Sequence, residues 1–115
     1  MEIIEKFTNN IAVLTVKSSI ISEVHAHQIQ EKMQNLLGRN IKYIVLNLGE
    51  VIYMSSLGIG VLVASMTTLR KIGGDLRLVC LSKSVQNSFT ITRLALVFRT
   101  YETAEEAVAS FKSEM

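Results

Sequence analysis

Two adjacent hydroxyls, Ser55 and Ser56, stand where an apolar stretch gives way to a helical pattern that runs to Ile72. A serine at a helix start can cap the first turn, because its oxygen accepts a hydrogen bond from an N–H without an intrahelical partner. The same position suits a phosphate, since those N–H groups and the positive end of the helix dipole face it. From these residues alone, a cap at Ser56 is favoured over a phosphorylation site, and the two roles are compatible.

Two glycines, Gly58 and Gly60, follow the serines with one apolar residue between them. Because glycine has no side chain, we expect another protein surface to approach the backbone closely here. The glycines do not form a P-loop, which needs a Lys-Ser/Thr pair after its last glycine. The segment therefore predicts a docking surface rather than a nucleotide site.

The rest of the chain gives little indication of a catalytic site or a metal site. His25 and His27 lie two residues apart on a predicted helix, where they point in nearly opposite directions and cannot share an ion. Ser56 followed by Gly58 is faintly similar to a hydrolase nucleophile elbow, but the first glycine of that motif is Met54 here. The only aspartate, Asp75, follows a glycine pair. We therefore predict no enzyme activity, no metal and no cofactor.

Composition limits the remaining possibilities. The 115 residues are 49% hydrophobic and carry a net charge of +2, which predicts one globular domain over residues 1–115. No basic block suggests nucleic-acid binding, and no apolar run is long enough to span a membrane. The N-terminus lacks a signal-peptide core. The lone Cys80, inside the apolar run Leu76 to Leu81, predicts a buried structural thiol and a reducing, cytoplasmic setting.

Strand and helix patterns alternate after an N-terminal hairpin, which turns at Asn9-Asn10. Gly38 and Gly73-Gly74 are predicted helix stops, and Thr103 with Glu106 predicts a capping box. The predicted strands are Glu2–Phe7, Ile11–Val16, Tyr43–Leu48, Leu76–Leu81 and Val97–Thr100. The first predicted helix is capped by Ser22 and runs from Glu23 to about Leu37, and the second runs from the Ser55-Ser56 pair to Ile72. A short third helix starts at Ser82 or Ser84 and turns Val85, Phe89 and Thr92 inward. The last helix starts at Thr103.

This order predicts an α/β fold, with a mixed sheet of about five strands and about four helices. The helix after Ser56 has two stripes. One is assigned to the core and comprises Ile59, Leu62, Met66 and Leu69. The other comprises Leu57, Val61, Ala64 and Thr68. This stripe is either buried against a neighbouring helix or exposed to a partner, and the sequence favours the two alternatives equally.

The chain resembles the STAS domain, specifically the bacterial anti-sigma factor antagonists. The family signature Asp-Leu-Ser-x-Val-x-x-Met/Ile-Asp-Ser-Ser/Ala-Gly-Leu-Gly aligns without gaps to residues 47–60, Asn-Leu-Gly-Glu-Val-Ile-Tyr-Met-Ser-Ser-Leu-Gly-Ile-Gly. The resemblance covers essentially the whole chain in length and order of elements. It places the family's phosphorylated serine on Ser56 and its preceding aspartate on Ser55, so that Ser55 is the second choice for phosphorylation.

The resemblance implies a partner switch. The unphosphorylated protein would bind an anti-sigma factor with serine kinase activity, which releases a sigma factor for transcription. Phosphorylation of Ser56 by that kinase would end the complex, and a PP2C-type phosphatase would restore it. The charge of about −1.5 to −2 is tolerable at a helix N-terminus but costly against a packed partner. We expect a monomer or weak dimer whose partner surface is formed by Ser18, Ser19, Ile21, Ser22, Ser55, Ser56, Leu57, Gly58 and Val61.

The sequence departs from the family at two places. Ser55 replaces the aspartate, and Ser18-Ser19-Ile20-Ile21 replaces a Gly-x-Leu/Ile-Asp segment. The alternative role is therefore a STAS scaffold or structural subunit of a signalling or lipid-transport complex without a phospho-switch.

Overall fold

The computed structural model of the chain describes residues 1–94 and 96–115. Strands and helices alternate along it after an initial hairpin, as the sequence pattern predicts, apart from two unpredicted short strands at Ile20–Ile21 and Tyr53–Met54. The elements are β1 (Glu2–Thr8), β2 (Ile11–Lys17), β3 (Ile20–Ile21), α1 (Glu23–Gly38), β4 (Tyr43–Asn47), β5 (Tyr53–Met54), α2 (Ser56–Lys71), β6 (Asp75–Val79), α3 (Lys83–Ile91), β7 (Thr100–Tyr101) and α4 (Ala104–Lys112).

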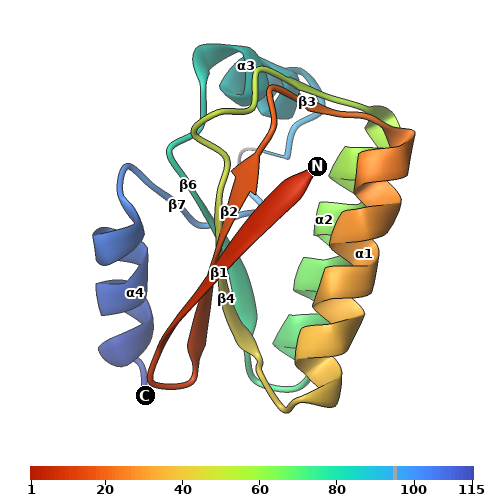
Figure 1. The fold of residues 1–115 in the computed structure, drawn as a ribbon. Coiled ribbons are helices and arrows are strands. Elements are labelled where there is room, and N and C mark those ends of the chain that lie inside the picture. Colours follow the sequence, from red (N-terminus) through yellow and green to blue (C-terminus); the bar gives the residue numbers. More distant parts are fainter. Residues whose placement is uncertain (95) are drawn as a thin grey trace.

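A five-stranded mixed sheet, in the order β1-β2-β4-β6-β7, forms the middle layer. The hairpin β1–β2 is antiparallel, and the other neighbours in this sheet are parallel. Helices α1 and α2 cover one face, α4 covers the other, and α3 lies across one end (Figure 1). The predicted α/β fold with its mixed sheet and N-terminal hairpin is confirmed. The strands β3 and β5 form a separate ladder of two parallel residue pairs.

The central strands are apolar because both of their faces are covered. In β4, Ile44 and Leu46 face the cluster beneath α1 and α2, and Val45 faces the smaller cluster beneath α4. Alternate residues of a strand point to opposite faces, so a strand between two helical layers is apolar throughout. Each of these side chains is fully buried and therefore stabilises the packing of the sheet against the helical layer that it faces.

The ends of the elements follow local chemistry, with one exception. Asn9 makes the hairpin turn with a φ of 58°, and Gly73 follows α2 with a φ of 87°, as the turn residues predict. The Ser22 hydroxyl accepts a hydrogen bond from the His25 N–H and caps α1. Gly38 is the last helical residue of α1, so the predicted helix stop is confirmed, but the glycine is not the residue that turns the chain. The left-handed residue there is Asn40, with a φ of 62°.

The segment before α4 differs most from the prediction. Thr92 is exposed at the end of α3 rather than inward, and the strand expected at Val97–Thr100 is the two-residue β7, Thr100–Tyr101. Residue 95, within the expected connection, lies outside the described residues. The Thr103 hydroxyl accepts from the Glu106 N–H, as expected of a cap. The Glu106 carboxylate, however, accepts from the Thr103 hydroxyl and not from the backbone.

A cluster of polar and charged residues lies on the face of the sheet that α4 covers. It comprises Asp75, Arg77, Ser110 and Glu114. The Arg77 side chain is only 4% exposed although it is charged, because it lies on the interior strand β6 beneath α4. Its Nε donates to Asp75 at 3.1 Å, and its Nη1 donates to Ser110 Oγ at 2.6 Å and pairs with Glu114 at 2.7 Å. A buried guanidinium is stable only when its donors are paired, so this cluster ties β6 to the last turn after α4.

The hydrogen bond from Arg77 holds the pKa of Glu114 below its ordinary value. A glutamate whose pKa is lower in the folded than in the unfolded chain stabilises the fold above its unfolded pKa, and that contribution is lost as pH falls through the folded pKa. Between about pH 5 and pH 3, the free energy of unfolding should therefore fall less steeply in Glu114→Gln than in the unchanged protein. Urea unfolding at several pH values measures this. Parallel profiles for the two proteins would contradict the role of this ion pair.

Candidate partner-binding site

The two serines at the start of α2 have different roles. Ser55 has extended backbone angles, φ −67° and ψ 161°, and its Oγ accepts a hydrogen bond from the Gly58 N–H at 3.0 Å. Ser56 is the first residue of the helix and is exposed, and its hydroxyl makes no hydrogen bond to any described residue. The expectation that Ser56 caps the helix was therefore wrong. Ser55 is the cap, and the Ser56 hydroxyl is free to react.

The short ladder of β3 and β5 positions these serines. Ile20 pairs with Tyr53 and Ile21 pairs with Met54, so β5 delivers the chain to Ser55. The Ser55 N–H then donates to the Ile21 carbonyl at 2.9 Å. Since β3 follows directly from β2 of the main sheet, the start of α2 is fixed to the scaffold through this ladder.

The two glycines face different surroundings. A Cβ on Gly58 would lie 3.0 Å from Met54 Cγ and 3.1 Å from Ile21 Cγ2, whereas a Cβ on Gly60 would meet nothing within 4 Å. Gly58 is buried and lets α2 pack against β3 and β5. Only Gly60 leaves backbone open to the outside. The predicted bare surface thus includes Gly60 but not Gly58.

The start of α2 also offers unpaired backbone donors. Neither the Ser56 N–H nor the Leu57 N–H donates a hydrogen bond within the described part of the chain. The first turn of the helix contains no acidic residue. Free N–H groups and the helix dipole favour a negative charge at this position, so a phosphate on Ser56 is compatible with the fold.

Exposed apolar side chains occur on the β3–β5 ladder, in the residue before β5 and in the first turn of α2. Ile52 is 60% exposed, Tyr53 58%, Ile20 46% and Leu57 40%. We call these four residues the apolar rim. Grouped apolar exposure is typical of protein interfaces. The sequence pattern missed Ile20, Ile52 and Tyr53.

Several residues expected in the partner surface are placed differently. Ile21, Gly58 and Val61 are buried, and Ser55 is only 9% exposed, so these residues support the surface from beneath. The remaining members are wholly or partly exposed, namely Ser18, Ser19, Ser22, Ser56 and Leu57. Ile20 takes the place of Ile21 because successive strand residues face opposite ways.

The burial of individual residues shows which of the two stripes of α2 faces the core. Leu62, Met66 and Leu69 are buried as predicted, and Ile59 is half-buried. In the second stripe Leu57, Ala64 and Thr68 are exposed, whereas Val61 packs into the core. Ala64 and Thr68 line a groove between α1 and α2, so of this stripe only Leu57 lies beside Ser56.

His25 belongs to this region as well, which was not foreseen. Its Nδ1 lies 2.7 Å from the Ile20 carbonyl, and its N–H donates to the Ser22 hydroxyl. The ring thereby connects the first turn of α1 to β3. The spacing Ser-x-x-His resembles a capping box with histidine in place of glutamate, and that spacing could have indicated it.

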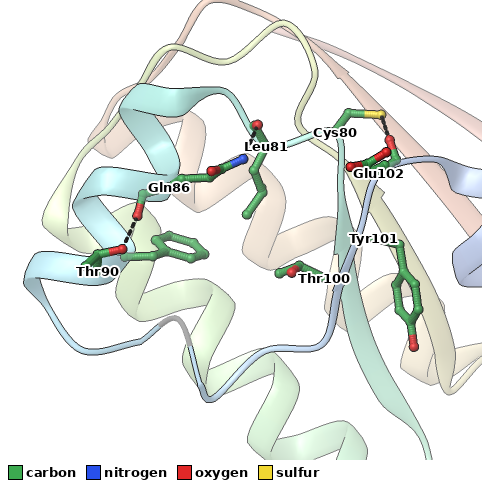
Figure 2. A pocket seen from close by; sticks show the side chains of 8 residues that line it. Cys80, Leu81, Gln86, Thr90, Thr100, Tyr101 and Glu102 are labelled. Atoms are coloured by element: carbon green, nitrogen blue, oxygen red, sulfur yellow. Dashed lines mark hydrogen bonds between the residues drawn. The ribbon is translucent and has the colours of Figure 1, made fainter.

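A hollow of about 580 Å³ lies elsewhere, between α3 and β7. In Figure 2 the Cys80 thiol donates to the Glu102 carbonyl, Gln86 donates to the Leu81 carbonyl, and Thr90 donates to Gln86. These polar groups are satisfied by the chain itself. Burial raises the pKa of the Cys80 thiol, and the residue is only partly exposed. The thiol follows β6 and is not within it.

A comparison with protein families identifies the fold. The STAS domain model matches residues 2–107. The chain belongs to the STAS domain family. The resemblance that the segment at residues 47–60 suggested is confirmed. Within the described residues, no helix of this STAS protein is both long and apolar enough to cross a membrane.

Several known proteins similar to this STAS chain carry the name anti-sigma factor antagonist. A Bordetella bronchiseptica protein with the provisional name anti-sigma factor antagonist BtrV is 27% identical over 84% of this chain and 83% of its own length. The unphosphorylated anti-sigma factor antagonist SpoIIAA superposes with a TM-score of 0.83 at 20% identity, over 97% of both chains. The phosphorylated form of SpoIIAA from Bacillus gives 0.74 at 20% identity, over 96% of this chain and 99% of that one.

The packing of Gly58 predicts opposite effects for two alanine substitutions. Gly60→Ala should stabilise the protein by about 0.5–1 kcal/mol, because alanine has less unfolded-state entropy to lose. Gly58→Ala gains the same term, but its methyl group overpacks Ile21 and Met54, which costs about 1–3 kcal/mol. Urea unfolding should show Gly58→Ala less stable than Gly60→Ala by about 1–3 kcal/mol. Equal stability would mean that the start of α2 accommodates a methyl group.

A second pair of alanine substitutions tests whether Ser55 caps α2 and Ser56 does not. Ser55→Ala removes the acceptor for the Gly58 N–H and should lower the free energy of unfolding by about 1 kcal/mol. Ser56→Ala removes a hydroxyl without a partner and should change it by less than about 0.5 kcal/mol. Thermal and urea unfolding of both variants measure the difference, and the reverse order would make Ser56 the cap.

Proposed function

We propose that this protein is a cytoplasmic, non-catalytic anti-sigma factor antagonist that switches partners through Ser56. The unmodified form binds an anti-sigma factor with serine kinase activity, which sets a sigma factor free. The kinase uses its own bound ATP to phosphorylate Ser56 and is released, and a PP2C-type phosphatase reverses the modification. The names of the similar bacterial proteins, BtrV and SpoIIAA, support the antagonist role.

The observation that carries the proposal is the exposed, unbonded hydroxyl of Ser56 at the helix start, next to the apolar rim. A kinase needs a hydroxyl that it can reach, and Ser56 is exposed whereas Ser55 is nearly buried with its oxygen occupied. Leu57 follows Ser56 directly in the first turn of α2, so we expect a partner that covers Leu57 to contact Ser56 as well. Recognition and modification therefore use the same surface.

The switch follows from the different surroundings of the phosphate in the two states. In the free protein, a phosphate on Ser56 faces water and the unpaired N–H groups of Ser56 and Leu57. In the complex the same charge would be removed from water against an apolar contact, which is costly. The modification thus weakens binding without requiring α2 to unfold.

The replacement of aspartate by Ser55 is compatible with this mechanism. The position caps α2, and serine and aspartate are equally good N-caps. A serine also leaves no carboxylate beside Ser56, so a phosphate there meets less like-charge repulsion. The phosphorylated SpoIIAA structure has the same fold, which supports the view that this fold tolerates the modification.

Incubation with a purified candidate kinase and Mg-ATP tests the proposal. We expect one phosphate on Ser56, located by mass spectrometry, in the unchanged protein and in Ser55→Ala, and none in Ser56→Ala. Ser56→Asp should bind the kinase at least about tenfold more weakly, because its carboxylate must be desolvated, while Ser56→Ala keeps its affinity.

The outcomes separate the switch from the alternative role. Binding that is equally tight for Ser56→Asp and Ser56→Ala, with no phosphate on either serine, would favour a scaffold subunit without a phospho-switch. Phosphate on Ser55 alone would contradict the assignment of Ser56. The unfolding transition of Ser56→Asp serves as the control, since the variant must be folded for its affinity to be meaningful.

A further inference from the structure

We propose that two copies of this chain associate by pairing their β1 strands, antiparallel, into a continuous sheet across the dimer. β1 is seven residues long and lies at the end of the strand order, with β2 on one side and no described strand on the other. The outer edge of such a strand presents unpaired N–H and C=O groups that another strand can bind. The inference is independent of the function proposed for Ser56.

The hairpin determines which backbone groups point outward. Thr8 pairs with Ile11 across the two-residue turn, and residues that flank such a turn exchange hydrogen bonds with each other. Hydrogen-bonded pairs alternate along an antiparallel ladder, so Ile4 also bonds to β2. The N–H and C=O groups of Ile3 and Glu5 therefore point to the free edge.

This alternation restricts the register of a symmetric pair. Outward-pointing residues must oppose outward-pointing residues, so the two-fold axis passes through a residue position and not between two. Centring on Glu5 or on Lys6 would place like charges opposite each other, which is unfavourable. Centring on Ile4 places Glu2 opposite Lys6 of the second copy, twice, and gives Ile3 and Glu5 four hydrogen bonds across the axis.

The side chains on both faces suit this register. Glu2, Ile4 and Lys6 share one face, all are exposed, and neither charge has an ion-pair partner among the described residues. They are opposite one another in the dimer at non-hydrogen-bonded positions, where cross-strand side chains are closest. The second copy therefore supplies an opposite charge to Lys6. It also supplies a second one to Glu2, which already lies opposite Lys17 on β2.

The other face has room for an incoming strand. Glu5 is held by Lys32 of α1 at 2.9 Å, so its charge is already compensated. A groove of about 460 Å³ lies beside β1 and is lined by Met1, Ile3, Gln28, Glu31, Lys32 and Asn35. The Ile3 and Glu5 side chains of a second copy would enter this groove.

Sedimentation velocity of the full chain with reversed charges tests the register. Glu2→Lys and Lys6→Glu should each weaken the dimer by about tenfold or more, and the double variant should restore it to within about threefold of the unchanged protein. If the net charge of the chain alone controlled dimer formation, the two single variants would change the dimer affinity in opposite directions. The net charge changes from +2 to +4 in Glu2→Lys, which would weaken association, and from +2 to 0 in Lys6→Glu, which would strengthen it.

Lys83→Glu is the matched control, because it changes the net charge from +2 to 0 at an exposed site on α3 and should leave the dimer unchanged. Amide hydrogen exchange gives a second measurement. With rising protein concentration the amides of Ile3 and Glu5 should exchange more slowly, while that of Ile4 stays constant. A chain that is monomeric up to about 1 mM, or a dimer that leaves Ile3 and Glu5 unprotected, would overturn the proposal.

Discussion

The contact of α2 with the β3–β5 ladder is the constraint on which the candidate site depends. Gly58 has no Cβ, so the first turn of the helix approaches Ile21 and Met54 more closely than any other residue would allow. That approach brings the Ser55 N–H to the Ile21 carbonyl. With Ser55 as the cap, the next residue, Ser56, begins the helix and is exposed.

The division of labour between Ser55 and Ser56 has a simple physical basis. The capping side chain of Ser55 turns back toward the helix and its oxygen is occupied, whereas the side chain of Ser56 is exposed and has no such role. An adjacent pair of hydroxyls therefore gives one structural and one accessible group. The change from aspartate to serine at the first position keeps the cap and removes a charge.

The fold was largely predictable because its information is local. The hairpin at Asn9, the cap at Ser22 and the stop at Gly73 depend on a few neighbouring residues, and burial on both faces makes β4 apolar throughout. The weaker predictions concern segments too short for a period to develop. With two residues in β3, sequence alone could not decide which of Ile20 and Ile21 is exposed.

Other features of the site required contacts between distant residues. Gly58 and Gly60 are equivalent in sequence, and only the approach of Ile21 distinguishes them. The burial of Arg77 likewise depends on Glu114, which is far along the chain, so a charged residue within β6 gave no local indication of its partner. The order of the residues thus predicted where the hydroxyls lie, and tertiary packing decided which one is free.

The separateness of the β3–β5 ladder has a consequence for motion. Two residue pairs join its strands, and neither strand is part of the main sheet. Ile21 and Met54 nevertheless anchor the ladder, because both are buried in the main core. The other pair, Ile20 and Tyr53, is exposed, so the freedom that remains is that of these two side chains. A protein that docks on the ladder would restrict their rotamers, and part of its binding free energy would be spent on ordering them.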